Sequence, residues 1–439
     1  MTEELGAGWH RLHPLSPFIN AGRLLSSLLG IAVLSLVTAD GLRAYVLQVA
    51  GAAALVVAGF VRWLVTRWKL DGATLRIETG LLRRDSRQLP MTRIQAVDVV
   101  RPFLARVLGL ACLRIRLAGA GKGGDRLAYL TVGEAARLRT VLLAGHHGLD
   151  PAAPEPAERP VISVPAGRVI GATLLRAAPR FAALAAVAVA AAEATPALFL
   201  ASESTLGVFA LGLVTRTWQQ LAGRYGFTVA TSHDGIRIRR GLLSTVAETI
   251  PFRRVQAVRL VQPLIWRPFG WCRLVVDVAG VAGRDSGPQA GGLTKALLPV
   301  GPMSEAQYLI GLVFGPDRPE LARPPGRARV KAPLSYHFLA SGHNELMAVT
   351  VTGRVTRKTV YMKLEKLQSV RFTQGPVQRR LSLASVHGDA AGRWAHAAFR
   401  DRPADQAREL LDELAALGRS ARSAEASGPA GELSAGPAG

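Results

Sequence analysis

The sequence predicts a mixed fold: four transmembrane helices in two hairpins, and three small β-barrel domains that are each closed by a C-terminal helix. Three observations lead to this fold class. One segment recurs along the chain, two long apolar stretches each have a central break, and the 439 residues combine 49% hydrophobic side chains with a formal net charge of +23. Membrane proteins with cytoplasmic domains often combine high hydrophobicity with positive charge, because Lys and Arg collect on the cytoplasmic side.

The recurring segment is an internal duplication, which must be recognised before a fold is assigned. Residues 72–119 and 233–280 align without a gap at a shift of 161 positions, with 17 identities in 48. A third, weaker copy at a further shift of 112 positions aligns 366–386 with 254–274. The ungapped alignment favours a true repeat for the first two copies. For the third copy, an unrelated strand of similar composition is the alternative interpretation.

Each copy predicts several short strands followed by one helix. In the first copy, alternation along the third strand places Ile94, Ala96 and Asp98 on one face, and Pro102 suits the first turn of a short helix. The expected elements are strands over 75–79, 86–90 and 94–100, a short helix over 102–109, strands over 112–119 and 127–132, and a helix over 133–145. The closing helices of the other two copies are expected over 304–314 and 402–418.

The first hairpin is predicted over 22–40 and 44–61, two segments joined by a few residues. A helix that crosses a bilayer needs about 20 mostly apolar residues, and these segments meet that need. Arg and Trp side chains follow the second segment, as expected for residues that anchor a helix at the membrane surface.

The second hairpin, predicted over 173–193 and 197–217, is interrupted by Glu193, Pro196 and Glu203. Charged groups are costly in hydrocarbon, so both glutamates are expected at or near the outer surface. One spanning helix with a re-entrant segment is the alternative, and it would move the second β-domain to the outside. With two complete hairpins, the N-terminus and all three repeats face the cytoplasm, because arginines flank that side. The predicted location is the cell (plasma) membrane, with several passes.

Composition also limits the other classes of function. The basic residues are spread along strands and loops without a dense tract, so no nucleic-acid partner is expected. Cys112 and Cys272 occur one per repeat without metal-ligand spacing, which fits a reducing compartment. The first 17 residues lack the apolar core of a cleavable signal peptide.

Four features resemble the bacterial membrane-flanked, pleckstrin-homology-like (YdbT-like) domain family: the RLHPLSP segment at 11–17, the paired helices, GLLRR…P…RIQAV from Gly80, and QGPVQRRLSLASV from Gln374. The resemblance extends from residue 9 to 417. It implies that the β-domains are pleckstrin-homology (PH)-like barrels in an integral membrane protein without established enzymatic activity. It also implies a smaller membrane-flanked PH-like protein as a candidate partner. The third copy departs from the family pattern, because Arg354 and Val355 replace paired leucines and no hairpin precedes it.

These observations define eight segments. They are an N-terminal segment with the first hairpin at 1–66, PH-like domain 1 at 67–147, a linker at 148–168, the second hairpin at 169–219, PH-like domain 2 at 220–315, a linker at 316–333, PH-like domain 3 at 334–418, and a disordered tail at 419–439.

No catalytic, cofactor-binding or metal-binding residue is predicted, so the chain is not expected to be an enzyme. The segment GAGKGGD at 119–125 fits G-x-G-x-x-G, but it leads into a strand instead of a helix and is interpreted as a loop. His146 and His147 are adjacent but lack a third ligand at metal spacing, and are expected in the linker.

Two groups of residues are candidates for contacts. Arg83, Arg84 and Arg87 form a basic cluster that resembles the phosphate-gripping loop of PH domains, and arginines near an anionic leaflet contribute about 1 kcal/mol each. The second copy lacks this cluster, and simple solvation of cytoplasmic charge is the alternative interpretation. The second group is His10, Arg11 and His13, just ahead of the first predicted membrane helix. These three residues are expected at the membrane interface.

The preferred hypothesis is a non-enzymatic membrane scaffold whose three cytoplasmic PH-like domains contact proteins and lipid headgroups. A role in envelope maintenance or stress protection is implied by the resemblance. The alternative function is lipid handling or transport by oligomerised hairpins. The expected partners are the lipid bilayer, the smaller PH-like relative and further copies of the chain.

Overall fold

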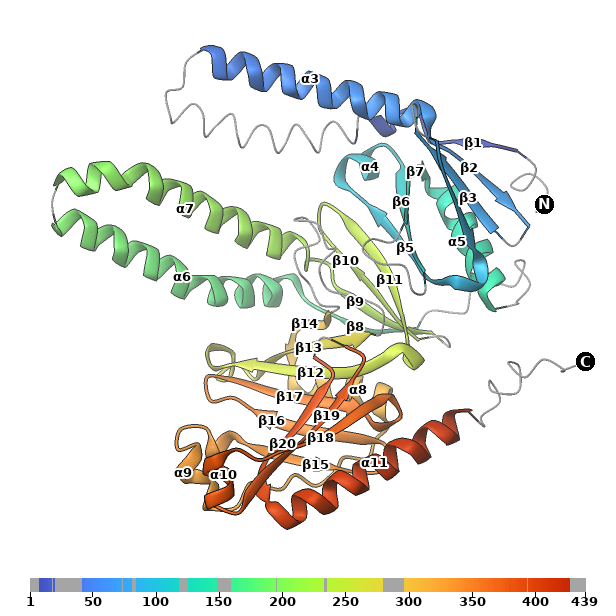
Figure 1. Ribbon diagram of the computed structural model, residues 1–439. Helices are drawn as coiled ribbons and strands as arrows, with labels where there is room; N and C mark the ends of the chain where they lie inside the picture. Colours follow the sequence, from blue (N-terminus) through green and yellow to red (C-terminus); the bar gives the residue numbers. More distant parts are fainter. Residues whose placement is uncertain are drawn as a thin grey trace, which may run out of the picture. The chain divides into compact units, whose positions relative to one another are not determined.

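The structure is a computed structural model of the 439-residue chain. It describes residues 8–17, 19, 42–72, 74–80, 84–117, 125–147, 159–194, 196–232, 235–278, 296–392 and 394–426. The chain forms two compact units (Figure 1). The first comprises Met1–Glu158, Arg180–Trp218 and Arg237–Thr249, and the second comprises Arg159–Pro179, Gln219–Ile236 and Ile250–Gly439.

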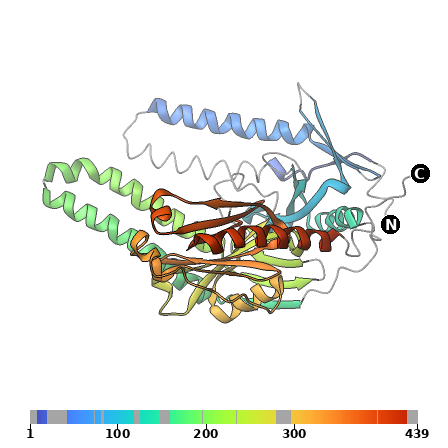
Figure 2. The same cartoon turned by 60° about the horizontal axis from the view of Figure 1, so that its bottom comes forward.

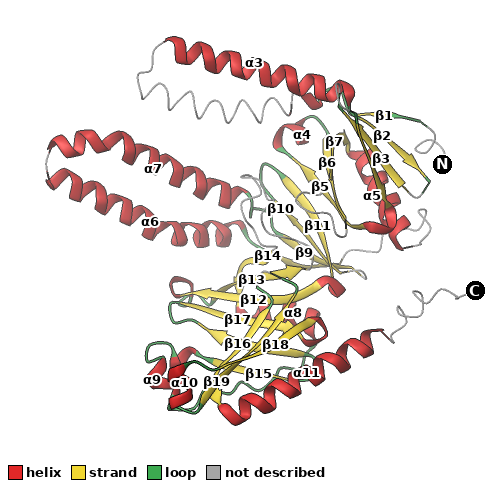
Figure 3. Cartoon of the chain, in the orientation of Figure 1, coloured by secondary structure: helices red, strands yellow, loops and turns green. Residues whose placement is uncertain are grey.

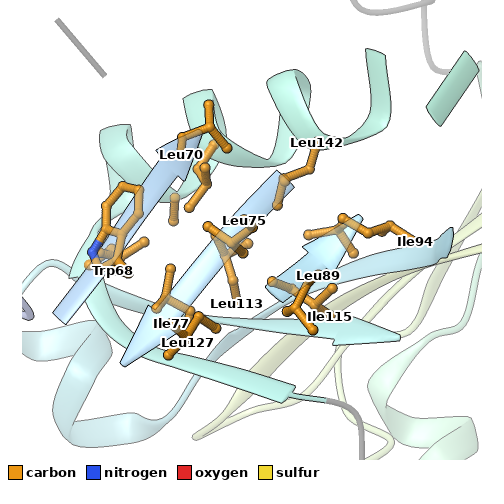
Figure 4. Close-up of a cluster of buried hydrophobic side chains, with 14 of the residues drawn as sticks. Trp68, Leu70, Leu75, Ile77, Leu89, Ile94, Leu113, Ile115, Leu127 and Leu142 are labelled. Carbon is orange, nitrogen blue, oxygen red and sulfur yellow. The ribbon is translucent and has the colours of Figure 1, made fainter. Parts of the chain in front are cut away.

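The first repeat consists of two β-sheet layers and a C-terminal helix, and the closing helix lies where the sequence predicts it. One sheet has the order β1 (His10–Arg11), β2 (Arg67–Asp71), β3 (Thr74–Thr79) and β4 (Asp85–Pro90). A second layer contains β5 (Ile94–Arg101), β6 (Leu110–Leu117) and β7 (Asp125–Thr131), and α5 (Val132–His147) closes the domain. Trp68, Leu75, Leu113, Leu127 and Leu142 are buried between sheets and helix (Figure 4). His146 and His147 therefore lie in the last turn of α5, and not in a linker as predicted.

The alternation predicted for β5 is wrong at its start, because the strand contains a β-bulge. The register shifts between Ile94 and Ala96, so that Ile94 and Val97 are both buried in the core. A bulge inserts one extra residue and reverses the faces that follow it. The same shift occurs at the equivalent positions of the other repeats, between Val255 and Ala257 and between Leu367 and Ser369. The bulge is therefore part of the repeat.

Three long helices correspond to the predicted membrane segments. They are α3 (Leu42–Val65), α6 (Ala166–Ala194) and α7 (Pro196–Ala222), and α7 runs back alongside α6 in both views (Figures 1 and 2). Within the described residues, one helix, Ala166–Glu193, is long and apolar enough to cross a membrane. The helix predicted over 22–40 lies outside the described residues. Four spanning helices thus stay a prediction.

The second unit contains a six-stranded sheet, in which three strands of the second repeat lie beside three strands of the third (Figure 3). Its order is β14 (Ala296–Pro302), β13 (Trp271–Val278), β12 (Val255–Pro263), β17 (Thr356–Lys363), β16 (Met347–Thr352) and β15 (Ala340–His343), with α8 (Met303–Phe314) following β14. The third repeat ends in the sheet β18 (Leu367–Thr373), β19 (Leu383–Ala390) and β20 (His396–Pro403), covered by α11 (Ala404–Ala426).

Consecutive repeats are joined by strand pairing, which the sequence analysis does not anticipate. In the first unit, β5 pairs with β11 (Thr245–Pro251) of the second repeat, and β11 is followed in the sheet by β10 (Gly235–Arg240). In the second unit, β12 of the second repeat pairs with β17 of the third. Both pairings are antiparallel. The three repeats are therefore linked in series rather than independent.

Segments expected to be linkers or tail also carry structure. The strand β8 (Arg159–Ser163) pairs with β9 (Thr228–Ser232), although it falls in the linker predicted at 148–168. A short helix, α9 (Ala328–Lys331), occupies the second linker. The helix α11 continues to Ala426, beyond the domain end predicted at residue 418.

Candidate membrane interface

The clearest surface feature is a pair of exposed apolar turns at equivalent places in the first two repeats. The strand β5 leads into α4 (Phe103–Val107), and β12 leads into the single turn η3 (Leu264–Trp266). We call residues 103–108 and 264–269 the apolar tips. Their exposed large side chains are Phe103, Leu104, Val107 and Leu108 in the first tip and Leu264, Ile265 and Phe269 in the second.

Proline and glycine set the local geometry of both tips. Pro102 and Pro263 precede the helical turns, where a fixed φ and a missing N–H are tolerated. Gly109 and Gly270 end the tips with φ of 66° and 63°, a left-handed conformation that glycine adopts without steric cost. The tips are therefore tight turns that hold several apolar side chains outward.

The first tip is anchored next to the start of the predicted membrane segment at 22–40. Ala105, the inward residue of the tip, packs with Ile19, Leu110 and Tyr129, and all four are buried. The backbone N–H of His13 donates to the carbonyl of Tyr129 at 3.1 Å, which fixes the chain ahead of Ile19. The tip thus lies beside the point at which the chain leaves the β-domain.

The second tip is anchored on the first half of α6 in the same way. Trp266 is 1% exposed, and the guanidinium of Arg176 lies 4.6 Å from its ring centroid, a favourable cation–π distance. Arg168 of α6 forms an ion pair with Glu305 of α8 at 2.9 Å. Gly171 leaves room for Trp271, whose ring would lie 3.4 Å from a Cβ at that position. These contacts fix the second repeat to this part of α6.

The contact with Arg176 places the second tip beside the N-terminal half of the candidate span. The candidate span extends over 28 residues, Ala166–Glu193, whereas about 20 residues suffice to cross the hydrocarbon core. If Glu193 lies at one surface, the other surface falls close to Arg176. Exposed Leu264, Ile265 and Phe269 are then expected at the level of the lipid headgroups. Exposed apolar patches of this kind often mark membrane or protein contacts.

The third repeat provides an internal comparison, because its equivalent turn is polar. In α10 (Pro376–Arg380), Val377 is the exposed large apolar residue. Gln378 takes the place of Trp266 and is buried, and its amide donates to the Asp401 carboxylate at 2.6 Å and to the Ser385 hydroxyl at 2.9 Å. No predicted membrane hairpin precedes this repeat. The apolar tip therefore occurs in the two repeats that follow a predicted hairpin.

The structure places His10, Arg11 and His13 at the edge of the first β-domain. His10 belongs to β1 and stacks on Trp68, with ring centroids 4.8 Å apart. His13 accepts a hydrogen bond at Nδ1 from the backbone N–H of Leu15 at 3.3 Å, which shapes the turn before Ile19. Arg11 is exposed and lies opposite Arg67 in the strand pair. Two of the three residues thus have structural contacts, whereas Arg11 forms no side-chain hydrogen bond or ion pair with the residues that the structure describes.

The cluster Arg83, Arg84 and Arg87 is only partly described, since Arg83 lies outside the described residues. Arg84 is exposed just before β4, and Arg87 on β4 forms an ion pair with Asp85 at 3.3 Å. In an extended chain, side chains three positions apart point to opposite faces. The structure therefore does not bring Arg84 and Arg87 together. Their proposed contact with lipid phosphate stays a prediction.

The sequence analysis missed the apolar tips, although a signal was present. It identified 102–109 as a short helix, and α4 confirms this helix. A five-residue helix has one inward position, here Ala105, so the large apolar residues around it must be exposed. The same reasoning applies to the second tip, where Trp266 takes the one inward position and its large apolar neighbours are therefore exposed. Both free cysteines lie on strands, Cys112 on β6 and Cys272 on β13. Burial, together with the Glu305 carboxylate, raises the pKa of Cys272 to about 12.

Three β-rich repeats beside apolar helices define the chain as a PH-domain membrane protein, and comparison with known proteins agrees. The bacterial PH domain family model matches residues 23–146, 170–314 and 338–418. The chain belongs to this family, and all three repeats, including the weaker third copy, are confirmed.

Similarity to a curated relative supports the assignment as a membrane protein. Transmembrane protein YdbT of Bacillus subtilis (strain 168) is 25% identical to the chain over 270 residues, which cover 55% of this chain and 54% of the relative. The chain therefore spans about half the length of the curated relative that it matches. It is a YdbT-like membrane protein with bacterial PH domains. No solved structure matches the chain.

Proposed function

We propose that the protein is a non-enzymatic, multi-pass scaffold of the cell membrane, with its three PH-like repeats in the cytoplasm. The first two repeats contact the inner leaflet through their apolar tips, whereas the third has no apolar tip for such a contact. This arrangement presents the outer surfaces of the repeats to proteins and lipid headgroups. We further propose a role in envelope maintenance or stress protection.

The observation that carries the proposal is the match between tips and helices. Both tips expose large apolar side chains next to a segment that is predicted to cross the membrane, and the repeat without a predicted hairpin has a polar turn. Burial of apolar surface in the interface contributes about 25 cal/mol per Å². Several exposed side chains per tip are thus enough to hold a tethered repeat against the bilayer, where no translational entropy remains to be lost.

A fluorescence experiment tests the membrane contact. Leu104, Ile265 and Val377 occupy the same position of the three repeats and are 39%, 43% and 50% exposed. Each is changed to Cys in a Cys112→Ala, Cys272→Ala background, labelled with an environment-sensitive dye, and reconstituted into vesicles that contain brominated lipids. We expect strong quenching at positions 104 and 265 and little at 377. Equal, weak quenching at all three positions would show that the tips do not touch lipid.

The physiological role is tested separately. In a strain that lacks the gene, wild-type protein is expected to restore survival under membrane-active agents, whereas a variant with Leu104→Ser and Ile265→Ser restores it poorly at equal abundance. The matched control, Val377→Ser, should behave as wild type. Full restoration by the double variant would separate envelope protection from membrane contact by the tips.

A further inference from the structure

The two joints between consecutive repeats are the same interface used twice. In the first joint, Val99, Val100 and Arg101 of β5 pair with Ala247, Val246 and Thr245 of β11. In the second, Leu260, Val261 and Gln262 of β12 pair with Thr359, Lys358 and Arg357 of β17. The repeat alignment places each of these pairs at equivalent positions. A shared register means that the repeat has a defined binding edge on each side.

An arginine reinforces both joints in the same manner. Arg106 Nη1 donates to the carbonyl of Leu242 at 3.1 Å, and Arg267 Nη2 donates to the carbonyl of Arg354 at 2.7 Å. These residues are again equivalent: each donor lies in the turn after the pairing strand, and each acceptor follows the turn glycine Gly241 or Gly353. The interface thus consists of a strand pair plus one arginine–carbonyl hydrogen bond.

The third repeat has the strand and the arginine of this interface, but no further repeat is joined to them among the described residues. Its equivalent strand, β18, is the terminal strand of the order β18-β19-β20, so its outer edge has no strand partner among the described residues. Gln368, Ser369, Arg371 and Thr373 of β18 are exposed. Arg379, the equivalent of Arg106 and Arg267, is exposed and forms no side-chain hydrogen bond or ion pair within the described part of the chain.

The first repeat has the matching strand, which corresponds to the strands that pair with β5 and β12 at the two internal joints. The strand β4, equivalent to β11 and β17, ends the order β1-β2-β3-β4, and Asp85, Ser86, Arg87 and Gln88 are exposed on it. An exposed strand edge is a template for pairing with another chain. The first repeat therefore offers the kind of strand edge that the third repeat would bind.

We propose that β18 of one molecule pairs with β4 of a second copy, in the register of the two internal joints. This register places Thr373 opposite Asp85 and Arg371 opposite Arg87, with Arg379 in the position that Arg106 and Arg267 have at the internal joints. Head-to-tail contacts of this kind build rings if the rotation closes and filaments if it does not. The joint is formed by β-strands and does not depend on the proposed contact of the tips with lipid.

The charges at the new joint are compatible with a second copy. Arg371 opposite Arg87 is a like-charge pair, which alone is unfavourable. However, Arg371 is ion-paired with Asp389 at 2.9 Å, and Arg87 with Asp85 at 3.3 Å. The four charges sum to zero, and Asp85 lies diagonally across from Arg371 in the proposed register. A second copy therefore fits the edge without an uncompensated charge.

Cross-linking of the full-length protein in membranes tests the register. Asp85→Cys and Thr373→Cys are placed on separate, differently tagged chains that lack Cys112 and Cys272. Directly opposed side chains in an antiparallel pair have Cβ atoms about 5 Å apart, so mild oxidation should yield a disulfide-linked dimer carrying both tags. Ser86→Cys paired with Thr373→Cys is the register control, since Ser86 points to the other face, and at least tenfold less product is expected.

Two results would overturn the proposal. One is the absence of a mixed-tag product while both variants retain wild-type thermal unfolding. The other is a product in which Thr373→Cys is linked to a different protein, which would assign the edge to another partner. As a non-covalent check, Arg379→Gln should shift the assembled species in mild detergent toward the monomer. Arg380→Gln, exposed in the same helix, is the matched control and should leave the assembly unchanged.

Discussion

At the scale of single residues, Ser382 has a backbone conformation that is unfavourable for a residue with a side chain. It has φ of 50°, and the equivalent residues Gly109 and Gly270 have φ of 66° and 63°. A side chain in the left-handed region costs about 1 kcal/mol or more, whereas glycine is tolerated there. The Ser382 side chain is exposed, and its neighbours Arg327 and Ala404 use its carbonyl oxygen.

We therefore expect Ser382→Gly to stabilise the third repeat by about 0.5 kcal/mol, the strain relieved less the added entropy of the unfolded chain. Slower hydrogen exchange of the β19 amides measures the gain. The reverse change, Gly270→Ser, should destabilise the second repeat. A faster-exchanging Ser382→Gly variant would show that the serine has a favourable contact that its backbone geometry does not explain.

A second residue, His387, makes the third repeat sensitive to acid. Burial, more than any neighbouring charge, lowers the pKa of His387 below 6.5. The charged groups that face it are His396, Arg371, Arg400 and Asp389. The unfolded chain then binds a proton more readily than the folded one, so stability is lost as the pH falls through 6.5 toward the folded pKa.

We expect hydrogen exchange of the β18 and β19 amides to accelerate between pH 7 and pH 5, after correction for the intrinsic rate. His387→Gln should flatten this dependence while keeping a polar group near the Thr373 hydroxyl, which lies 3.1 Å from His387 Nε2. His337→Gln, outside this strand pair, is the control and should retain the wild-type dependence. The prediction fails if the β18 and β19 amides show no excess acceleration in the wild-type protein.

At the scale of elements, neighbouring tip residues should separate stability from membrane contact. Trp266 is 1% exposed beneath Arg176, and Ile265 next to it is 43% exposed. Truncation of a buried Trp to Ala costs about 3–5 kcal/mol, so Trp266→Ala should release the second repeat from α6 and increase its cleavage by protease. Ile265→Ala should leave cleavage unchanged and weaken only the contact with lipid. Equal cleavage of the two variants would contradict the anchoring of this tip through Trp266.

The elements also show which parts of the fold the sequence was able to predict. Local signals such as Gly80, Pro102 and the amphipathic closing helices identified turns, the α4 segment and the helices at nearly correct positions. The bulge after Ile94 was not predictable from alternation, because alternation assumes that no residue is inserted. The joints were hidden for a different reason. Pairing between β5 and β11 links residues more than a hundred positions apart, and the sequence of one strand does not show which distant strand pairs with it.

The candidate site shows the same division between local and distant information. The sequence marked charged groups, such as Arg84 and Arg87, because charges stand out along a chain. It did not mark Phe103 or Ile265, which look like core residues until the packing of Ala105 and Trp266 shows which side is inward. Exposure is a property of the packed domain, so the apolar tips required the structure.

At the scale of the whole molecule, the proposed topology predicts on which side of the membrane each repeat lies, and this can be measured. Single Cys substitutions at exposed positions report it: Gln88 in the first repeat, Tyr308 in the second and Arg408 in the third, with Glu193 at the far end of α6. All are made without Cys112 and Cys272. In the proposed topology an even number of crossings keeps the repeats on one side, and the arginines that flank the hairpins predict that this side is the cytoplasm.

With a membrane-impermeant maleimide, intact cells should label the Glu193→Cys variant and none of the three repeat variants. Inverted vesicles should give the opposite pattern. The second repeat is the critical case, because a single spanning helix at α6 with a re-entrant α7 would expose Tyr308→Cys on intact cells while Gln88→Cys stayed protected. That pattern would also separate the first two repeats by a bilayer, which is incompatible with the pairing of β5 with β11 in one sheet. Labelling of Tyr308→Cys with protection of Gln88→Cys would therefore contradict both the proposed topology and the pairing of β5 with β11.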